Sequence, residues 1–335
     1  MKEALLYEKQ AGKIVRCFLC AHRCLIREGG VGFCGVRQNQ GGVLYSLVYG
    51  KIIAQQVDPI EKKPLYHFLP GSNSYSIATV GCNFRCDFCQ NWEISQKTAT
   101  DGLVPGEDVE PAQIVQAAKA YGCASIAYTY TEPTISLEFA RDVAYRAHAH
   151  GLANVFVTNG YMTEECARLI SPYLDAANVD LKFFNEASYR RICKASLAPV
   201  CDSIRRLKEL GIWVEVTTLV IPGENDSENE LRGIAEFLAG IDRHIPWHIS
   251  RFHPDYKFDT YPVTPRAALA RAESCARQAG LIYVYTGNVQ EQTQTACYHC
   301  GKVLIKREIF TVLENTLLHG ACPACGTKMP GVFEN

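Results

Sequence analysis

Short apolar runs alternate with helical patterns from about residue 74 to residue 290, and this alternation restricts the fold of the 335-residue chain more than any other feature. One run and one helical pattern recur roughly every 25–40 residues, which is typical of βα units around a parallel sheet. The sequence therefore predicts an α/β fold. The predicted strands are residues 76–80, 125–130, 154–158, 178–183, 213–220 and 247–252, with 281–285 as a candidate seventh strand.

The segments between the predicted strands carry signals for helix ends. Pro111 stands at a plausible first helical position, and Ser227 followed by Glu230 has the pattern of a capping box. Gly240 is predicted to close the helix that begins after Ser227. Six βα units fit a partial (β/α)6 barrel, an open TIM-like barrel in which chemistry occurs at the carboxyl ends of the strands.

Three cysteines, Cys82, Cys86 and Cys89, follow the first predicted strand at the spacing C-x3-C-x2-C. Three thiolates in one loop can hold three irons of a [4Fe-4S] cluster, whereas an ordinary electron-carrying cluster takes a fourth cysteine. The next cysteine in the sequence is Cys123. The fourth iron is then open to a small molecule that the cluster can reduce. We predict such a cluster here; the alternative is a three-cysteine zinc loop.

A second group of cysteines, Cys17, Cys20, Cys24 and Cys34, lies near the N-terminus. In a reduced cytosol, clustered cysteines more often bind metal than form disulfides. Nearby glycines permit a backbone folded tightly around a metal. Four cysteines suit either a tetrahedral zinc site or a second iron–sulfur cluster, and the sequence leaves both open.

A third group, Cys297, Cys300, Cys322 and Cys325, forms two C-x2-C-G knuckles. This is the spacing of a zinc ribbon, in which four thiolates close a structural zinc site. Iron in a similar site is the alternative, because ligand type alone does not exclude it. The chain is thus predicted to have a Cys-rich N-terminal module (1–73), a partial barrel (74–290) and a small zinc-ribbon module (291–335).

Two further predictions concern local structure. Residues 43–49 and 51–54 have the pattern of a hairpin around Gly50. The five remaining cysteines are predicted to be small core residues: Cys123, Cys166, Cys193, Cys201 and Cys275.

Polar residues gather where the predicted strands end. Asp180 and Lys182 are two residues apart on one strand, so both point to one face. The carboxyl ends of parallel strands meet at one edge, which also carries the three-cysteine loop, so we predict a single site there. Its other candidate members are Thr131, Glu132, Thr158, Asn159 and His253.

The motifs of this predicted site stand in a recognisable order: C-x3-C-x2-C, T-E-P, T-N-G, D-L-K, V-I-P-G-x-N-D and F-H-P. They resemble those of the radical S-adenosylmethionine (SAM) activating enzymes of the pyruvate formate-lyase activase group. With both cysteine-rich ends included, the chain is similar to the radical SAM proteins of the AmmeMemoRadiSam system. The core resemblance covers about residues 55–290.

This resemblance implies an oxidoreductase that cleaves SAM reductively through its [4Fe-4S] cluster. The resulting 5′-deoxyadenosyl radical would take a hydrogen atom from a glycine of a partner enzyme, as in glycyl radical activating enzymes, or from a small molecule. An external reductant such as flavodoxin or ferredoxin is implied. An alternative from a different class is a multi-metal binding or electron-transfer protein without SAM chemistry. That alternative would leave the residues at the strand ends without a role.

The resemblance also implies roles for single residues. Phe88 packs near the adenine, Glu132 helps to hold the methionine amino group, and His253 lies against the ribose. Asp180 and Lys182 lie beside the SAM carboxylate or the substrate. Cofactor-binding positions within the T-E-P and T-N-G motifs also include Thr131, Thr158 and Asn159.

The chain departs from the activase pattern at three places. The first two glycines of the G-G-E-P stretch are replaced by Tyr130 and Thr131, and the aspartate that binds a monovalent cation is replaced by Val157. An arginine on the fifth strand is replaced by Thr217 and Glu215. These differences predict a different substrate face.

Composition and charge exclude several classes of partner. The formal net charge is −1, so no electrostatic footprint for nucleic acid stands out. The N-terminus has no apolar signal region, and no run of 18 apolar residues occurs. We expect a cytoplasmic protein without a membrane span.

Overall fold

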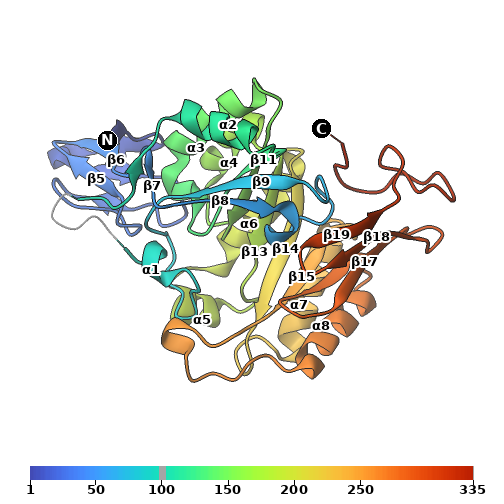
Figure 1. Cartoon of the computed structure of the whole chain (residues 1–335). Coiled ribbons are helices and arrows are strands. Elements are labelled where there is room, and N and C mark those ends of the chain that lie inside the picture. Colours follow the sequence, from blue (N-terminus) through green and yellow to red (C-terminus); the bar gives the residue numbers. More distant parts are fainter. Residues whose placement is uncertain (98–102, 335) are drawn as a thin grey trace.

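The centre of the molecule is an eight-stranded, mostly parallel sheet (Figure 1), which confirms the predicted α/β fold. The computed structural model describes residues 1–97 and 103–334. In space the strands follow the order β16-β15-β14-β13-β12-β11-β9-β8, and β8 pairs antiparallel with β9 at one edge. The strands are β8 Ala54–Pro59, β9 Asn73–Ala78, β11 Ser125–Tyr128, β12 Ala153–Thr158, β13 Ala176–Asp180, β14 Trp213–Val220, β15 Trp247–Arg251 and β16 Val284–Gly287.

Each strand predicted for the βα units is present in the central sheet, with small shifts at the ends. The candidate seventh strand is confirmed as β16, which pairs parallel to β15. It begins at Val284 rather than at Leu281, because the Leu281 backbone amide still donates to the Ala276 carbonyl and so completes the turn after the preceding helix.

Helices connect the parallel strands and pack on the sheet (Figure 1). Pro111 is the first residue of its helix, as predicted, because its fixed φ suits that position. The helices are α1 Trp92–Ser95, α2 Pro111–Ala120, α3 Leu137–His148, α4 Glu164–Ile170, α5 Glu186–Ser188, α6 Leu197–Glu209, α7 Glu228–Ile241 and α8 Arg266–Gln278.

The predicted ends of α7 are correct at one terminus and wrong at the other. The Ser227 hydroxyl accepts from the Glu230 amide at 3.3 Å, but the Glu230 carboxylate accepts from the Phe184 amide and so joins the helix to a distant loop. Gly240 lies inside the helix, which continues to Ile241. The helix stops because Asp242 is extended, with φ −161°.

The N-terminal module contains two small antiparallel sheets. They consist of β1 Lys2–Glu3, β6 Val43–Ser46 and β5 Arg37–Gln40, and of β2 Tyr7–Lys9, β3 Val15–Cys17 and β4 Leu25–Ile26.

The predicted hairpin around Gly50 is wrong. Strand β6 forms its hairpin with β5 instead, across Gly41 and Gly42, which have φ of 65° and 89° and therefore make the tighter turn. Strand β7 (Lys51–Ile52) pairs with β10 (Glu107–Asp108).

The C-terminal module is a three-stranded antiparallel sheet at the opposite end of the molecule from the N-terminal module (Figure 1). Its strands are β17 Gln292–Ala296, β18 Val303–Glu308 and β19 Thr311–Asn315. Arg307 joins it to the loop before β9: the fully buried guanidinium donates to the Tyr66 carbonyl at 2.7 Å and lies 3.4 Å from Glu61. Within the described ranges, the helices are too short or too polar to cross a membrane.

A second buried arginine joins the N-terminal module to helix α3. The Arg37 guanidinium lies 2.8 Å from the Glu138 carboxylate of α3, and both side chains are 2% exposed. Arg37 also donates to the Leu5 carbonyl at 2.8 Å. Burial opposes the charge on Arg37, but the Glu138 carboxylate overcomes this and raises its pKa. Arg37 is thus charged inside the protein.

We expect Glu138→Ala to destabilise the protein by about 3–5 kcal/mol, because it leaves the Arg37 charge buried without its partner. The change is measured as a lower urea midpoint, with earlier proteolytic cleavage between the module and the barrel. The double variant Arg37→Met/Glu138→Leu is the control, since it removes both charges. A loss in the double variant equal to that in Glu138→Ala would contradict this account.

Candidate functional site

The three-cysteine loop begins just beyond β9, at the carboxyl end of the parallel sheet. The chain turns at Gly81, which has φ +92°, and an added Cβ there would lie 2.7 Å from the Val36 side chain. Only glycine fits this turn. The turn places Cys82 against the N-terminal module and starts the loop on the side of the sheet where the other candidate residues lie.

The thiols of this loop are desolvated. Burial is the main cause that raises the pKa of Cys82 well above its usual value, and the Glu132 charge adds to it. A hydrogen bond with the Cys193 thiol, followed by burial, does the same for Cys86. Desolvated thiols are costly to ionise alone, and a bound metal supplies the compensating positive charge.

Hydrogen-bond donors point at the sulfurs. The Phe84 amide donates to Cys82 Sγ at 3.3 Å, and the Ser95 hydroxyl lies 3.2 Å from Cys89 Sγ. Asn83 Nδ2 is buried beside Cys82 and has no hydrogen-bond partner among the described residues. An iron–sulfur cluster offers acceptors for such donors, so the donor set fits the group that the sequence predicts.

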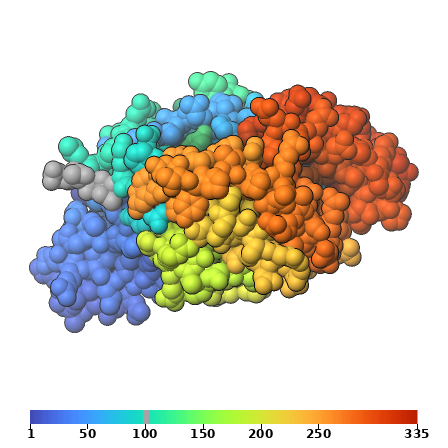
Figure 2. All heavy atoms as spheres, turned by 90° about the horizontal axis from the view of Figure 1, so that it is seen from below, coloured from blue at the N-terminus to red at the C-terminus, as the bar shows by residue number. Residues whose placement is uncertain are grey.

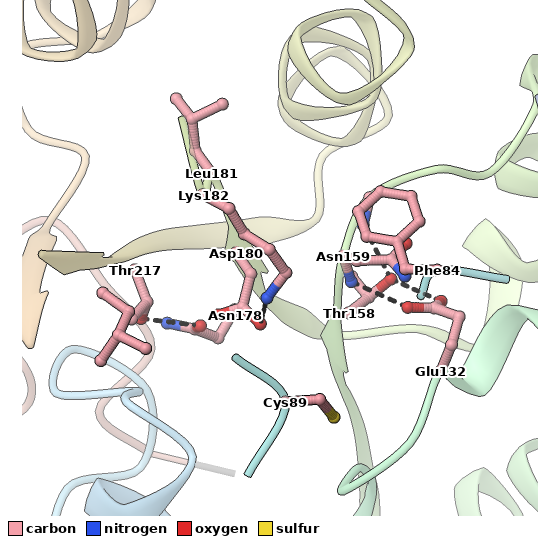
Figure 3. A network of polar contacts seen from close by, with 12 residues as sticks. Phe84, Cys89, Glu132, Thr158, Asn159, Asn178, Asp180, Leu181, Lys182 and Thr217 are labelled. Carbon is pink, nitrogen blue, oxygen red and sulfur yellow. Dashed lines mark hydrogen bonds and ion pairs between the residues drawn. The ribbon is translucent and has the colours of Figure 1, made fainter. Parts of the chain in front are cut away.

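Glu132 forms the centre of a buried polar network at the ends of β11 and β12 (Figure 3). Its Oε1 accepts from the Thr158 hydroxyl at 2.7 Å and from the Thr134 hydroxyl at 2.5 Å, and its Oε2 accepts from the Asn159 amide at 2.8 Å. Burial raises the pKa of Glu132, although these donors oppose the shift. The T-E-P and T-N-G motifs are therefore one unit in the structure.

This network continues to the cysteine loop through Asn159. Its Nδ2 donates to Asn83 Oδ1 at 2.7 Å and lies 3.8 Å from Cys82 Sγ. The two residues are both buried. The structure thus brings Glu132, Thr158 and Asn159 together with the first cysteine of the loop.

In the view of Figure 3, Asp180 and Lys182 lie on the opposite side of Cys89 from Glu132. Lys182 Nζ is 2.8 Å from Asp180 Oδ2 and 5.6 Å from the centre of the Phe88 ring. Burial alone would lower the pKa of Lys182. The Asp180 carboxylate, together with the neighbouring Cys86 and Cys193 thiols, instead raises it well above its usual value. A cation is therefore held next to the cysteine loop.

Phe88 itself is 4% exposed and packs against Phe183 and Phe258, each at 6.0 Å between ring centres. Thr131 is turned toward the end of the neighbouring strand β9, where its hydroxyl donates to the Thr79 carbonyl at 2.8 Å. These contacts fix both residues at the edge of the site.

The departures from the activase pattern have structural reasons. Tyr130 has φ 63°, a left-handed conformation that glycine adopts more easily, and its hydroxyl bonds the Asp58 carboxylate. Glu215 is fully buried near the start of β14 and accepts from the His67 amide at 2.7 Å, so it secures the loop before β9. The Thr217 hydroxyl donates to Asn178 Oδ1 at 2.9 Å within the sheet (Figure 3).

His253 is exposed after β15 and lies apart from the Glu132 network. It lines a cavity of about 390 Å³ together with Gln90 from the cysteine loop and Ile309 and Phe310 from the C-terminal module. Tyr66, from the loop before β9, lines the cavity as well, so segments from all three predicted parts of the chain (1–73, 74–290 and 291–335) meet around it.

The segment that follows β15 lies against the cysteine loop. In Figure 2 this orange segment lies beside the teal segment near residue 90. The rings of Trp92 and Tyr256 stack at 5.1 Å, and Lys257 Nζ is 3.0 Å from Asp87 Oδ1. These contacts cover the outer side of the loop.

Sequence reasoning missed two residues that lie beside the cysteines of the loop. Cys193, predicted to be a core residue, is buried as expected but lies beside Cys86. Asn83 was passed over because a single asparagine between cysteines carries no motif of its own. Only packing reveals these contacts, since Cys193 belongs to the distant helical turn η5 (Tyr189–Cys193).

The four C-terminal cysteines are arranged for a single metal ion. Their sulfurs all lie within 4.8 Å of one another, and the Cys297–Cys325 and Cys300–Cys322 Sγ distances are 3.7 and 3.6 Å. Four thiolates about 2.3 Å from one tetrahedral zinc ion stand roughly 3.8 Å apart, so the group matches the predicted ribbon site. Among the described residues it is the one group of three or more possible ligands this close together.

The family model of the radical SAM superfamily matches residues 76–237. The uncharacterized protein MJ0808 of Methanocaldococcus jannaschii is 44% identical over 334 residues, which cover 98% of this chain and 99% of that protein. A putative glycyl-radical enzyme activating enzyme of the same organism, MJ1632, is 25% identical and aligns with 54% of this chain and 68% of its own length.

Among solved structures, Streptococcus suis SuiB bound to S-adenosylmethionine superposes with a TM-score of 0.51. The match covers 68% of this chain and 53% of SuiB at 11% sequence identity. At this identity the similarity concerns the fold alone.

We expect Cys322→Ser to lower the bound metal at the C-terminal site by at least half and the unfolding temperature by roughly 5 °C, because a structural metal site contributes folding free energy. Metal analysis and thermal unfolding measure the two effects. Cys275→Ser, which removes a thiol from α8, is the control for the loss of one cysteine. Unchanged metal content in Cys322→Ser would count against the site.

Proposed function

The chain belongs to the radical SAM superfamily, and we propose that it binds a [4Fe-4S] cluster through Cys82, Cys86 and Cys89 and acts on SAM at the carboxyl edge of its sheet. When bound, the cluster supplies the electron that cleaves SAM to methionine and a 5′-deoxyadenosyl radical. The observation that carries the proposal is the placement of the cysteine loop between the Glu132 network and the Asp180–Lys182 pair. We take the βα units as a partial (β/α)6 barrel.

Lys182 is the residue best suited to bind the SAM carboxylate. It is only 16% exposed, and Asp180 keeps it protonated and aimed toward the loop. A charge-assisted hydrogen bond in such a desolvated place is strong and directional. Phe88, whose ring lies beside the ammonium group, offers an apolar face for the adenine.

Glu132 is proposed to receive the amino group of the methionine moiety. Its Oε1 is occupied by three donors from Thr134 and Thr158, but Oε2 has a single one, the Asn159 amide. The second lone pair of Oε2 can therefore accept from an ammonium. Thr158 and Asn159 hold the carboxylate in place, and Thr131 braces the preceding turn.

The cavity beside His253 is proposed to hold the ribose and the substrate. It is enclosed partly by Phe310 and Ile309 of the C-terminal module, which limits access of water. In this role the C-terminal site holds zinc and supports the cavity wall. The N-terminal cysteines are proposed to hold metal as well.

For the reaction we propose hydrogen abstraction from a glycine of a partner protein. Similarity to a putative glycyl-radical enzyme activating enzyme supports this choice. The cysteine-rich ends support placement among the radical SAM proteins of the AmmeMemoRadiSam system. The electron is proposed to come from an external flavodoxin or ferredoxin.

The test is anaerobic reconstitution with iron and sulfide, followed by dithionite and SAM. We expect 5′-deoxyadenosine and methionine in equal amounts, and, with a suitable partner protein, a glycine-centred radical signal. Product formed only when a small molecule is added would reject the protein substrate. Absence of product and of any spectral change on adding SAM would reject the proposal.

Cys86→Ala is expected to abolish SAM cleavage, because two thiolates do not hold the cluster. Circular dichroism should show a folded barrel, and iron analysis should show loss of about four irons. Cys123→Ala, which removes a cysteine outside the site, should retain the iron and the activity. If the folded Cys86→Ala protein still cleaves SAM, the assignment of the cluster to Cys82, Cys86 and Cys89 is wrong.

Lys182→Met is expected to weaken SAM binding at least about tenfold, since one charge-assisted hydrogen bond contributes about 1.5–3 kcal/mol. The change is measured as the SAM concentration that gives half of the spectral shift of the reduced cluster. Lys182→Arg keeps the charge and should bind SAM better than Lys182→Met. Equal binding by wild type and Lys182→Met would exclude this role.

A further inference from the structure

The N-terminal cysteines Cys17, Cys20, Cys24 and Cys34 lie against the loop of the proposed radical cluster. We propose that they hold a second [4Fe-4S] cluster and that this cluster passes electrons to the first. The inference rests on the proposed function of the Cys82 loop. Three features of the structure favour it over a structural zinc ion: the spacing of the sulfurs, the shared wall and the exposed edge.

The spacing of the sulfurs differs between the two ends of the chain. The four C-terminal sulfurs lie within 4.8 Å of one another, as one zinc ion requires. In the described part of the chain, no three of the N-terminal sulfurs are that close, and the same holds for Cys82, Cys86 and Cys89. A cubane places an iron at each thiolate and therefore needs wider spacing than a single ion.

The N-terminal sulfurs nevertheless form one group. The Cys17 amide donates to the Cys24 carbonyl at 2.9 Å, and the Arg23 amide, next to Cys24, donates to the Cys20 carbonyl at 3.0 Å. The Phe33 amide points at Cys24 Sγ at 3.5 Å. Cys17 and Cys34 are buried, and Cys20 and Cys24 are half-buried. Four such cysteines with a backbone donor aimed at one sulfur make a site that a multi-iron cluster fits.

The two cysteine groups share a wall without another element between them. His22 Nε2 lies 2.7 Å from the Asn83 carbonyl oxygen, so it joins the N-terminal loop to the Cys82 loop. A Cβ added to Gly81 would lie 3.0 Å from the Cys34 carbonyl oxygen. Arg85 donates to the Phe33 carbonyl at 2.6 Å. Electron transfer weakens steeply with distance, and this packing makes the distance short.

The N-terminal site also reaches the surface beside Cys24. Leu25, next to Cys24, is 67% exposed, and Cys24 itself is half-buried. An external low-potential one-electron carrier can thus approach the N-terminal site. The carrier loses one electron, the second cluster gains it, and the second cluster then gives it to the radical cluster and returns to its oxidised state.

The first experiment counts metals in the full chain after anaerobic reconstitution. We expect about eight irons and eight sulfides per chain, with zinc at the C-terminal site only. Cys24→Ser and Cys86→Ala should each retain about four irons, and Cys123→Ala should retain all eight. Four irons together with two zinc ions in the wild type would overturn the inference, even if no variant folds.

Electron paramagnetic resonance separates this inference from the proposed function. In the reduced wild type we expect two signals, of which only one changes when SAM is added. Cys24→Ser should keep the signal that responds to SAM, and Cys86→Ala should keep the one that does not. Two signals that both ignore SAM would reject the proposed function and leave the second cluster standing. A single signal that responds to SAM would reject the second cluster and leave the proposed function standing.

Electron relay is tested with reduced flavodoxin as the donor. In Cys24→Ser, the rate at which flavodoxin produces the SAM-responsive signal should fall at least about tenfold relative to the rate with dithionite, a difference of about 1.4 kcal/mol in activation free energy. The Cys123→Ala protein should show the wild-type ratio. A wild-type ratio in Cys24→Ser would reject the relay.

Discussion

Parallel pairing of the strands from β9 to β16 is the constraint on which the site depends. Because these strands run in one direction, their carboxyl ends meet at one edge, and each motif that follows a strand is brought there. The buried Glu132 carboxylate then joins the ends of β11 and β12, and Asn159 continues the contacts to the cysteine loop. Polar groups in so dry a place persist only when they are paired, so the network fixes its own geometry.

Two buried arginines attach the N-terminal and C-terminal modules through paired polar groups of the same kind. Arg37 pairs with Glu138 beneath the N-terminal module, and Arg307 joins the C-terminal module to the loop before β9. Each charge is stable inside the protein because its partner is buried with it, so each module has one strongly preferred position. The consequence is functional: the modules that carry the outer cysteine groups are held against the cysteine loop on one side and the cavity on the other.

Much of this architecture could be predicted from sequence, and the failures have physical causes. Local patterns found the parallel strands of the central sheet and the start of α7 at Ser227, but not the antiparallel edge strand β8. They failed at Gly240, since an exposed glycine can remain in a helix until a residue such as Asp242 turns extended. They also failed at Gly50, because a tight turn at Gly41 and Gly42 pairs β6 with β5 instead.

The sequence by itself determined the order of the βα units and the three cysteine groups, because periodicity and short spacing are properties of neighbouring residues. Tertiary structure decided how these groups meet. The tight C-terminal sulfurs, the contact of His22 with the Asn83 carbonyl and the charge that Asp180 maintains on Lys182 depend on distances between residues or on burial. Distances across the sheet are set by packing of the whole core, and no local pattern encodes them.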